Sequence, residues 1–334
     1  MGLALPVLKN PALAEEKKNK PAVCGLVSDA RFKRHLTGRG HADSPDRFDA
    51  VHAALEKAGF SAQLKKIESR EATQEEILRV HTRKYYDIVK SDFEAGKRRL
   101  STGDTAISAD SLMVASLASG SALNATDAVC TGTLKRVFCN LRPPGHHASP
   151  SRGMGFCIWN HVALVARHAQ QVHKIGRVLI VDWDVHHGNG TQDAFYEDDT
   201  VFVFNTHQAP WYPGTGHSSE TGLGKGKGFT MNCPLPAGSG RKEILGAMEN
   251  KLIPAMKSFR PELVLISAGF DSRKDDPLGG FLLEDQDFAD MTELLAKVAA
   301  DSAEGRMISL LEGGYHLSGL ASACTAHVQA LVDA

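Results

Sequence analysis

Buried strand-like runs alternate with helical patterns along the chain, and this alternation is the feature that most constrains its fold. The runs are short and rich in Val, Ile, Leu and Phe, which is typical of parallel strands buried on both faces. They lie at 22–27, 62–67, 136–140, 178–182, 201–205, 263–267 and 307–311. Amphipathic or alanine-rich segments that predict helices lie at 45–58, 82–94, 108–129, 156–172, 241–258, 283–303 and 317–332. This order predicts an α/β fold in which helices cover both faces of a mostly parallel sheet.

The 334 residues contain no internal repeat, low-complexity linker or shift in composition that would mark a domain boundary. We therefore predict a single domain over residues 21–334, preceded by a disordered or loosely attached segment over residues 1–20. A domain of this size can bury enough apolar surface to fold without a metal or a disulfide.

Composition narrows the class of ligand and the cellular compartment. The 38 Lys and Arg against 39 Asp and Glu give a net charge of −1, which argues against nucleic-acid binding and favours a small or neutral substrate. The six cysteines form no CxxC pair, as expected in a reducing compartment. The first residues lack the pattern of a signal or transit peptide, and no window approaches the ~20 apolar residues of a membrane span. We therefore predict a cytoplasmic protein that does not bind a membrane.

Long loops rich in glycine and proline follow several of the predicted strands. They lie at 141–155, 182–191, 206–228 and 268–280. In open α/β sheets, ligands bind outside the carboxyl ends of the strands, where such loops gather. The active site is therefore expected among these loops.

The segment 178–190, VLIVDWDVHHGNG, is the most informative one. Asp182, Asp184 and His186 stand at alternate positions, so their side chains share one face if the extended conformation continues beyond the strand. Ligand-type side chains among apolar neighbours are costly to bury unless they pair or bind a metal. A helix-capping Asp and a core histidine would explain single members of this cluster but not the whole, so we favour a metal site.

Asp271, in LVLISAGFDSRKDDPLGG (263–280), would complete this ligand group, because it follows another predicted strand. Two carboxylates, one imidazole and an open position for water are typical of a catalytic zinc site. The alternative for Asp271 is a turn residue, which is the interpretation we adopt for Asp275 and Asp276.

Two further loops carry side chains suited to acid–base and oxyanion chemistry. His146 and His147, in LRPPGHHAS (141–149), cannot lie on a helix after two prolines, and their near-neutral pKa suits proton transfer. Taken alone, a solvated surface turn explains this His pair better. Tyr315, in SLLEGGYHL (309–317), could donate to a developing oxyanion, although an aromatic lid on the core explains it equally well.

Together these motifs resemble the histone deacetylase/acetylpolyamine amidohydrolase superfamily, on its class II side. The resemblance covers roughly residues 22–330, and the combination is highly specific although each motif alone is not. The matching segments are GHADSPDRF (40–48), VHTRKYYD (80–87), RPPGHH (142–147), GMGFCIWN (153–160), DWDVHHGNGTQDAF (182–195), WYPGTG (211–216), GLGKGKG (222–228), SAGFDSRKDDPLGG (267–280) and EGGYHLSGL (312–320).

The resemblance implies an arginase/deacetylase-like fold with a central, mostly parallel eight-stranded sheet. It implies one Zn²⁺ per chain, held by Asp184, His186 and Asp271. It also implies that His147 acts as general base and acid, with His146 as its electrostatic partner. Tyr315 would stabilise the tetrahedral intermediate.

The resemblance further places Asp182 behind His146 and Asn189 behind His147. Asn189 is the class II form, since class I enzymes carry Asp at this position. A neutral partner should leave His147 less readily protonated than an Asp would.

For substrate binding, the resemblance implies a tunnel in which Phe156 and Tyr212 flank an acyl-lysine stem, with Gly155 between them. Asp104 lies in the loop with which relatives grip the substrate backbone. Leu278 stands where polyamine-specific relatives carry a gatekeeper Glu, so acyl-lysine is favoured over acetylpolyamine.

A structural K⁺ is also implied by the resemblance. Its expected ligands are Asp182, Asp184, Asn205 and backbone carbonyls near His186 and Thr206.

We therefore predict zinc-dependent hydrolysis of the amide of ε-acetyl-lysine, or of another short acyl-lysine, in a peptide or protein. One alternative is an acetylpolyamine amidohydrolase, which acts on a small acylated amine. Others are a dimanganese ureohydrolase on the same fold and a catalytically inactive acyl-lysine binder. The RPPGHH and EGGYH motifs disfavour the ureohydrolase, and the complete set of candidate catalytic residues disfavours the inactive binder. Ferrous iron would suit the same ligands, and the oligomeric state is not predicted.

Overall fold

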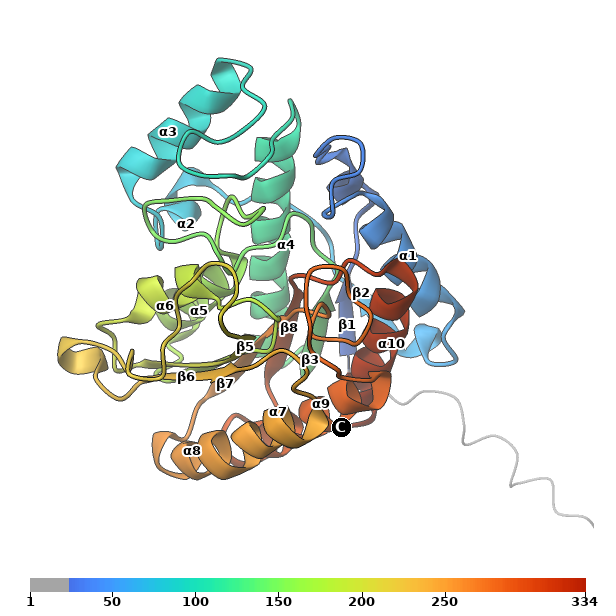
Figure 1. The fold of residues 1–334 in the computed structure, drawn as a ribbon, viewed down its shortest axis with the longest axis vertical. Helices are drawn as coiled ribbons and strands as arrows, with labels where there is room; N and C mark the ends of the chain where they lie inside the picture. Colours follow the sequence, from blue (N-terminus) through green and yellow to red (C-terminus); the bar gives the residue numbers. More distant parts are fainter. Residues whose placement is uncertain (1–23) are drawn as a thin grey trace, which may run out of the picture.

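The computed structural model describes residues 24–334, so the predicted N-terminal segment 1–20 lies outside the described residues. The described chain forms one eight-stranded sheet in the order β2-β1-β3-β8-β7-β4-β5-β6, and every neighbouring pair is parallel (Figure 1). The strands are β1 (Cys24–Val27), β2 (Leu64–Lys66), β3 (Arg136–Cys139), β4 (Val178–Asp182), β5 (Val201–Gln208), β6 (Thr230–Leu235), β7 (Leu263–Ala268) and β8 (Met307–Leu311). The predicted single α/β domain with a mostly parallel eight-stranded sheet is confirmed.

Helices cover both faces of this sheet (Figure 1). They are α1 (Asp46–Lys57), α2 (Gln74–Ile77), α3 (Arg83–Glu94), α4 (Ser111–Cys130), α5 (His161–His173), α6 (Asn189–Phe195), α7 (Arg241–Ala247), α8 (Ile253–Phe259), α9 (Asp285–Ser302) and α10 (Leu317–Asp333). Successive residues of a strand enter different cores. In β4, Val178 and Ile180 belong to the cluster that includes α4 and α5, whereas Leu179 and Val181 belong to the cluster that includes α9 and α10. Because both faces are buried, the strands read as continuous apolar runs. No helix within residues 24–334 is long and apolar enough to cross a membrane.

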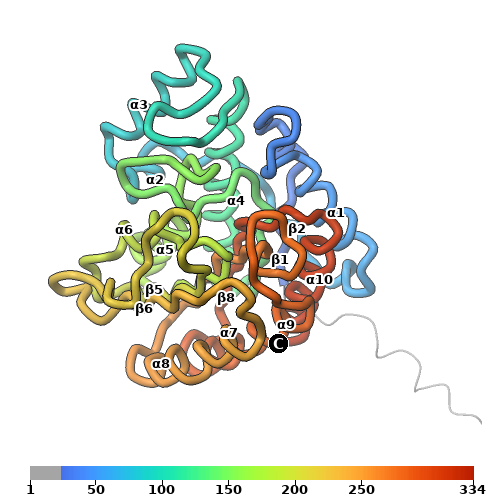
Figure 2. Tube along the Cα trace, in the orientation of Figure 1, coloured from blue at the N-terminus to red at the C-terminus, as the bar shows by residue number. Residues whose placement is uncertain are grey.

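The sheet order differs from the chain order, and this difference assembles the site. The last strand, β8, lies between β3 and β7, so the red C-terminal segment returns to the middle of the molecule (Figure 2). Strands β3, β8, β7 and β4 are therefore consecutive neighbours. Their carboxyl ends lead into the loops that carry His147, Tyr315, Asp271 and Asp184. Three of the loops predicted to hold the active site, 141–155, 182–191 and 268–280, thus meet the loop that carries Tyr315 at the carboxyl ends of the strands.

Several local features differ from the sequence prediction, and the short helices α2 and α6 were not predicted. The edge strand β6 was not predicted, because TMNCPL mixes polar and apolar residues and contains Pro234, which only an edge strand tolerates. The helix expected over 156–172 begins at His161, where the Asn160 side chain accepts the Ala163 N–H at 3.0 Å. The helix expected over 241–258 is interrupted by a π-helical turn, Met248–Leu252.

A histidine buried between α10, α9 and β8 makes the free energy of unfolding depend on pH. The ring nitrogens of His327, on α10, lie 2.6 and 2.7 Å from the hydroxyl oxygens of Thr292 and Ser309. Burial lowers the pKa of His327 from 6.5 to about 3, so the unfolded chain takes up its proton first. Because the unfolded state then binds more protons, the free energy of unfolding should fall by up to about 1.4 kcal/mol per pH unit below pH ~6.5 and level off near pH 3.

We therefore expect His327→Gln to make the free energy of unfolding less sensitive to acid. Gln can both donate to and accept from the two hydroxyl groups without carrying a proton-dependent charge. Urea unfolding at several pH values between about 7 and 4.5 measures the difference in slope. The exposed His217→Gln serves as the matched control and should keep the wild-type slope. Identical slopes for the wild type and His327→Gln would contradict the assignment.

Candidate active site

Asp184, His186 and Asp271 form a buried group of potential metal ligands. The Nδ1 atom of His186 lies 3.0 Å from Asp184 Oδ1 and 3.2 Å from Asp271 Oδ2. Among the described residues, Asp271 Oδ2 is a buried oxygen with no hydrogen-bond partner. Two buried carboxylates that face one imidazole carry uncompensated negative charge, which is costly without a cation. The geometry and charge of these residues therefore fit a divalent cation.

The local backbone gathers these ligands in a way the sequence analysis did not predict. Strand β4 ends at Asp182, so the extended conformation, which was the condition for a shared face, does not continue to His186. Instead, Asp182 Oδ1 accepts the Asp184 N–H at 3.1 Å, and Asp184 Oδ1 accepts the His186 N–H at 2.9 Å. Each of these hydrogen bonds closes a turn between a backbone N–H and an Asp side chain. The two successive turns follow the strand and still bring the side chains of Asp184 and His186 together.

Gly313 lets a second loop approach the ligand group closely. Its N–H donates to Asp184 Oδ2 at 2.8 Å, and a Cβ at this position would collide with carboxylate oxygens of Asp184 and Asp271. The carboxylates of Asp184 and Asp271 create a negative electrostatic potential here, which favours a positively charged group. Burial lowers the pKa of His186, but the nearby carboxylates of Asp184 and Asp271 outweigh burial and raise it to about 10.

The His pair is oriented by two different partners. The Nδ1–H of His146 donates to Asp182 Oδ2 at 2.9 Å, because an ionised carboxylate can only accept. The Nδ1 of His147 lies 2.7 Å from Asn189 Oδ1, which also accepts. The two rings lie 4.0 Å apart, centroid to centroid. These contacts leave the Nε2 atom of each ring available toward the site.

The environments of the two histidines drive their pKa values apart. Burial lowers the pKa of His146, but the carboxylates of Asp182, Asp184 and Glu312 outweigh burial and raise it well above its ordinary value. Burial and the neighbouring His146 and His186 lower the pKa of His147 well below its ordinary value. His146 is therefore disposed to carry a positive charge, and His147 is disposed to stay neutral and accept a proton. Such a difference is typical of an acid–base pair.

Glu312 is a buried residue whose role the sequence analysis missed. Its Oε2 accepts the N–H groups of Gly145 and His146 at 2.7 and 3.1 Å, and its Oε1 accepts the Ser267 hydroxyl at 3.0 Å. Glu312 therefore fixes the loop that carries the His pair. No spacing signal points to it, because these contacts join loops that are distant in sequence.

Tyr315 is held by side chains from another loop and from helix α1. Asp276 Oδ2 accepts the N–H groups of Tyr315 and His316 at 2.7 and 3.1 Å. The guanidinium of Arg47 lies 4.9 Å from the centroid of the Tyr315 ring. Burial raises the pKa of Tyr315 well above its ordinary value, so the phenol keeps its proton and can donate. The interpretation of Asp276 as merely a turn residue is wrong, since it is buried and orients Tyr315.

A cavity of about 250 Å³ brings these groups together. Its lining residues are Asp104, His147, Gly155, Phe156, His186, Trp211, Tyr212, Leu278 and Tyr315. All the residues predicted to contact substrate are among them, and Trp211 is an addition that the sequence analysis did not single out. Gly155 has a φ of 57°, and a Cβ there would collide with the His147 ring.

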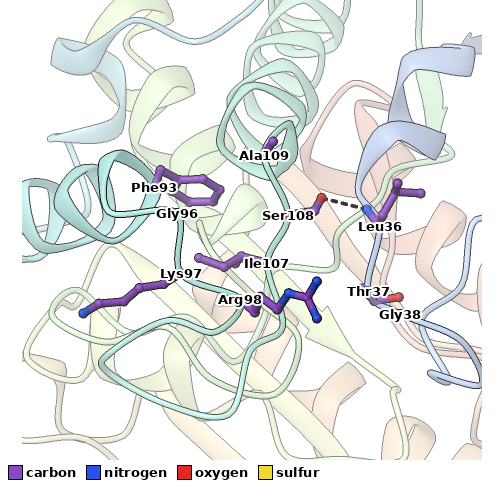
Figure 3. A pocket seen from close by; sticks show the side chains of 10 residues that line it. All are labelled: Leu36, Thr37, Gly38, Phe93, Gly96, Lys97, Arg98, Ile107, Ser108 and Ala109. Atoms are coloured by element: carbon purple, nitrogen blue, oxygen red, sulfur yellow. Dashed lines mark hydrogen bonds between the residues drawn. The ribbon is translucent and has the colours of Figure 1, made fainter.

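A larger cavity, of about 580 Å³, lies between the segment around Leu36 and the segments around Phe93 and Ile107 (Figure 3). Its described lining contains the cations Lys97 and Arg98 but no histidine, carboxylate, cysteine or tyrosine. It therefore lacks the side chains for metal binding or acid–base chemistry. The smaller cavity is the candidate active site.

The residues predicted to hold potassium lie at and just beyond the end of β4 and within β5. Asp182 pairs with Asn205 in the sheet register, and Thr206 follows Asn205. Asn205 Oδ1 accepts the Gly188 N–H at 3.2 Å. These residues are neighbours in space, and potassium binding stays a prediction.

Asp127, His168 and His173 form a second group with the composition of a metal site. The Nε2 atoms of both histidines lie 2.7 Å from Asp127 Oδ1, and Arg79 Nη1 lies 2.6 Å from His168 Nδ1. Because Arg only donates, His168 Nδ1 accepts, and its Nε2 carries the proton given to Asp127. A metal at Nε2 would instead require a proton on Nδ1, facing Arg79. This group is therefore a hydrogen-bond network between α4 and α5.

The comparisons with known proteins identify the family of the chain. The family model of the histone deacetylase domain matches residues 41–331. The chain is 35% identical over 299 residues to a probable deacetylase of Archaeoglobus fulgidus, covering 89% of this chain and 82% of the relative. It is 37% identical over 301 residues to the human polyamine deacetylase HDAC10, covering 87% of this chain and 44% of the relative. The crystal structure of the HDA15 HD domain matches with a TM-score of 0.88 and 34% identity, covering 93% of this chain and 90% of that one.

A parallel α/β sheet with buried ligand-type side chains at the carboxyl ends of its strands defines the general class, an α/β fold with a candidate metal site. Within that class, the chain belongs to the histone deacetylase family, and the resemblance seen in the sequence is confirmed. Deacetylase or amidohydrolase activity follows from this membership.

Proposed function

We propose that the chain is a zinc-dependent amidohydrolase that removes acetyl, or another short acyl group, from the ε-nitrogen of lysine in a peptide or protein. The observation that carries this proposal is the cavity of about 250 Å³, in which His186 of the ligand group, His147 and Tyr315 all line one space. Zn²⁺ bound by Asp184, His186 and Asp271 would polarise the acyl carbonyl and increase the acidity of a water molecule.

The side chains would then share the proton transfers of amide hydrolysis. His147 is oriented through Asn189 and takes the proton from the water that adds to the carbonyl carbon. His147 returns this proton to the lysine nitrogen as the C–N bond breaks, which yields a free amine and a carboxylic acid. His146, held by Asp182, supplies charge beside it. Tyr315 donates a hydrogen bond to the carbonyl oxygen as negative charge develops there.

The lining of the cavity favours acyl-lysine as the substrate. The aromatic rings of Phe156 and Tyr212 both line the cavity, and such rings suit a flat amide on a methylene chain. Leu278 contributes an uncharged side chain. Acylation has removed the charge of the lysine amine, so this group can enter an apolar space without the cost of burying an ion.

The second candidate is an acetylpolyamine amidohydrolase. It is favoured by the similarity to HDAC10, a polyamine deacetylase, and disfavoured by Leu278. The dimanganese ureohydrolase is disfavoured further, because the other group of three ligand-type side chains among residues 24–334, Asp127, His168 and His173, forms a hydrogen-bond network between α4 and α5.

The test is to compare kcat/KM for an acetyl-lysine peptide and for acetylspermidine, with a series of acyl lengths on the same peptide. We expect the acetyl-lysine peptide or a longer acyl-lysine peptide to be the better substrate. A higher kcat/KM for acetylspermidine would replace the proposed substrate with a polyamine.

Leu278→Glu should shift the preference toward the polyamine. A carboxylate at the entrance would attract the free ammonium groups of acetylspermidine, and an exposed ion pair contributes about 1 kcal/mol, or about fivefold. We therefore expect the ratio of kcat/KM for acetylspermidine to that for the peptide to rise about fivefold. Leu282→Glu, which adds the same charge at an exposed position of the same segment outside the cavity lining, is the matched control. An unchanged ratio in Leu278→Glu would show that Leu278 does not set this preference.

A further inference from the structure

Trp211 has an exposed ring at the entrance of the candidate active site. Its exposed fraction is 45%, whereas Trp159 and Trp183 are buried. It lines the same cavity as His147 and His186, which lie at the buried end. Large aromatic side chains that remain exposed beside a binding site are typical of contact residues in recognition.

We propose that Trp211 is a specificity-determining residue that contacts an apolar side chain next to the acyl-lysine of a peptide substrate. This inference rests on the proposed function and names the part of the peptide, outside the acyl-lysine itself, that the protein selects.

The Trp211 ring is held in place before any substrate binds. Its indole N–H donates to the Leu278 carbonyl oxygen at 2.8 Å. The adjacent Tyr212 hydroxyl donates to Asp104 Oδ2 at 3.2 Å, and Asp104 Oδ1 accepts the Gly155 N–H at 2.7 Å. Residues 211 and 212 are thus connected to both sides of the entrance. A fixed ring loses little conformational entropy when a ligand packs on it, which makes the contact more favourable.

The surroundings of the Trp211 ring favour an apolar side chain of the substrate over a charged one. Leu278 places an aliphatic side chain in the same lining, so Trp211 and Leu278 both contribute apolar surface to the cavity. The one carboxylate of this lining, Asp104, already accepts the Tyr212 hydroxyl and the Gly155 N–H. An aliphatic side chain of the peptide would therefore gain from burial on this surface, whereas a polyamine chain would have to bring an ammonium group against it.

The test compares acetyl-lysine peptides that differ in one neighbouring residue. Leu is placed before or after the acetyl-lysine, and an otherwise identical peptide with Gly at both positions is the reference. We expect kcat/KM of the wild type to be about tenfold higher for at least one Leu peptide than for the Gly peptide. This is the lower end of the range of effects that apolar contacts in a binding pocket have on kcat/KM. Trp211→Ala should reduce this preference to about twofold or less, through KM rather than kcat. Trp211→Phe keeps a ring and should retain most of the preference.

A matched control and a binding measurement complete the design. Leu223→Ala removes an exposed apolar side chain, 57% exposed, from outside the cavity lining, and should keep the wild-type preference. Peptide affinities are also measured by calorimetry in a Tyr315→Phe background, in which turnover is slowed. If the protein binds a Leu peptide more tightly than the Gly peptide and Trp211→Ala abolishes this difference, the inference is supported. This holds even if no peptide is hydrolysed. In that case only the proposed function fails.

Two results would overturn the inference. One is equal kcat/KM and equal affinity of the wild type for the Leu and Gly peptides. The other is a loss in Trp211→Ala that is largest for acetylspermidine, which would show that the ring binds a cation through its face instead of an apolar side chain.

Discussion

Asp271→Asn should abolish tight metal binding and lower deacylation about a thousandfold, equivalent to about 4 kcal/mol of transition-state stabilisation. The substitution keeps the volume of the side chain, and an amide oxygen can still accept the Val185 N–H, now 2.9 Å from Asp271 Oδ1. It removes one of the two negative charges that face His186. The measurements are metal content after gel filtration and kcat/KM for an acyl-lysine peptide.

The fold of Asp271→Asn should survive the change. Burial and the neighbouring Asp184 raise the pKa of Asp271 to about 7, which shows that this carboxylate is costly in the folded protein without a cation. The metal-free variant should therefore unfold at a temperature no lower than that of the metal-free wild type. Asp275→Asn is the matched control in the same loop, because Asp275 is exposed and its φ of 69° suits Asn. A variant at Asp271 that keeps both bound metal and activity would contradict the ligand assignment.

Tyr315→Phe should lower kcat by about a hundredfold to a thousandfold and leave KM within about threefold. Removing one donor to a developing oxyanion has an effect of this size, and the contact exists mainly in the transition state. The ring contacts should persist, because the aromatic ring remains beside Arg47 and Phe156, whose centroid lies 6.0 Å from that of Tyr315.

Tyr86→Phe is the control for loss of a phenol hydroxyl elsewhere. Tyr86 stacks on Trp159 with centroids 5.8 Å apart, outside the cavity lining, and its variant should keep the wild-type kcat. A Tyr315→Phe enzyme with unchanged kcat would remove Tyr315 from the proposed chemistry.

The fold was predictable where the strands are buried on both faces. The runs at 178–182 and 263–267 read as strands because each of their apolar residues packs into one of two cores. Strand β6 is different, since it pairs only with β5 and carries the polar Asn232 and the imino acid Pro234. An edge strand of this kind has no period that distinguishes it from a loop.

The candidate site was predictable only in part, and for a physical reason. The spacing of Asp182, Asp184 and His186 indicated a cluster, although turns rather than an extended strand produce it. Glu312 and Asp276 were missed because they act through backbone N–H groups of distant loops. Such contacts follow from the order of strands in the sheet, which the residues of one loop do not specify.

The most direct test of the central proposal is the dependence of acyl-lysine hydrolysis on zinc. The protein is freed of metal with a chelator, and the rate of acetyl release from an acetyl-lysine peptide is measured as Zn²⁺ is added back. We predict no hydrolysis without metal and a rate that rises to saturation at about one Zn²⁺ per chain. Full activity after rigorous removal of the metal would contradict the account, as would a requirement for two manganese ions per chain.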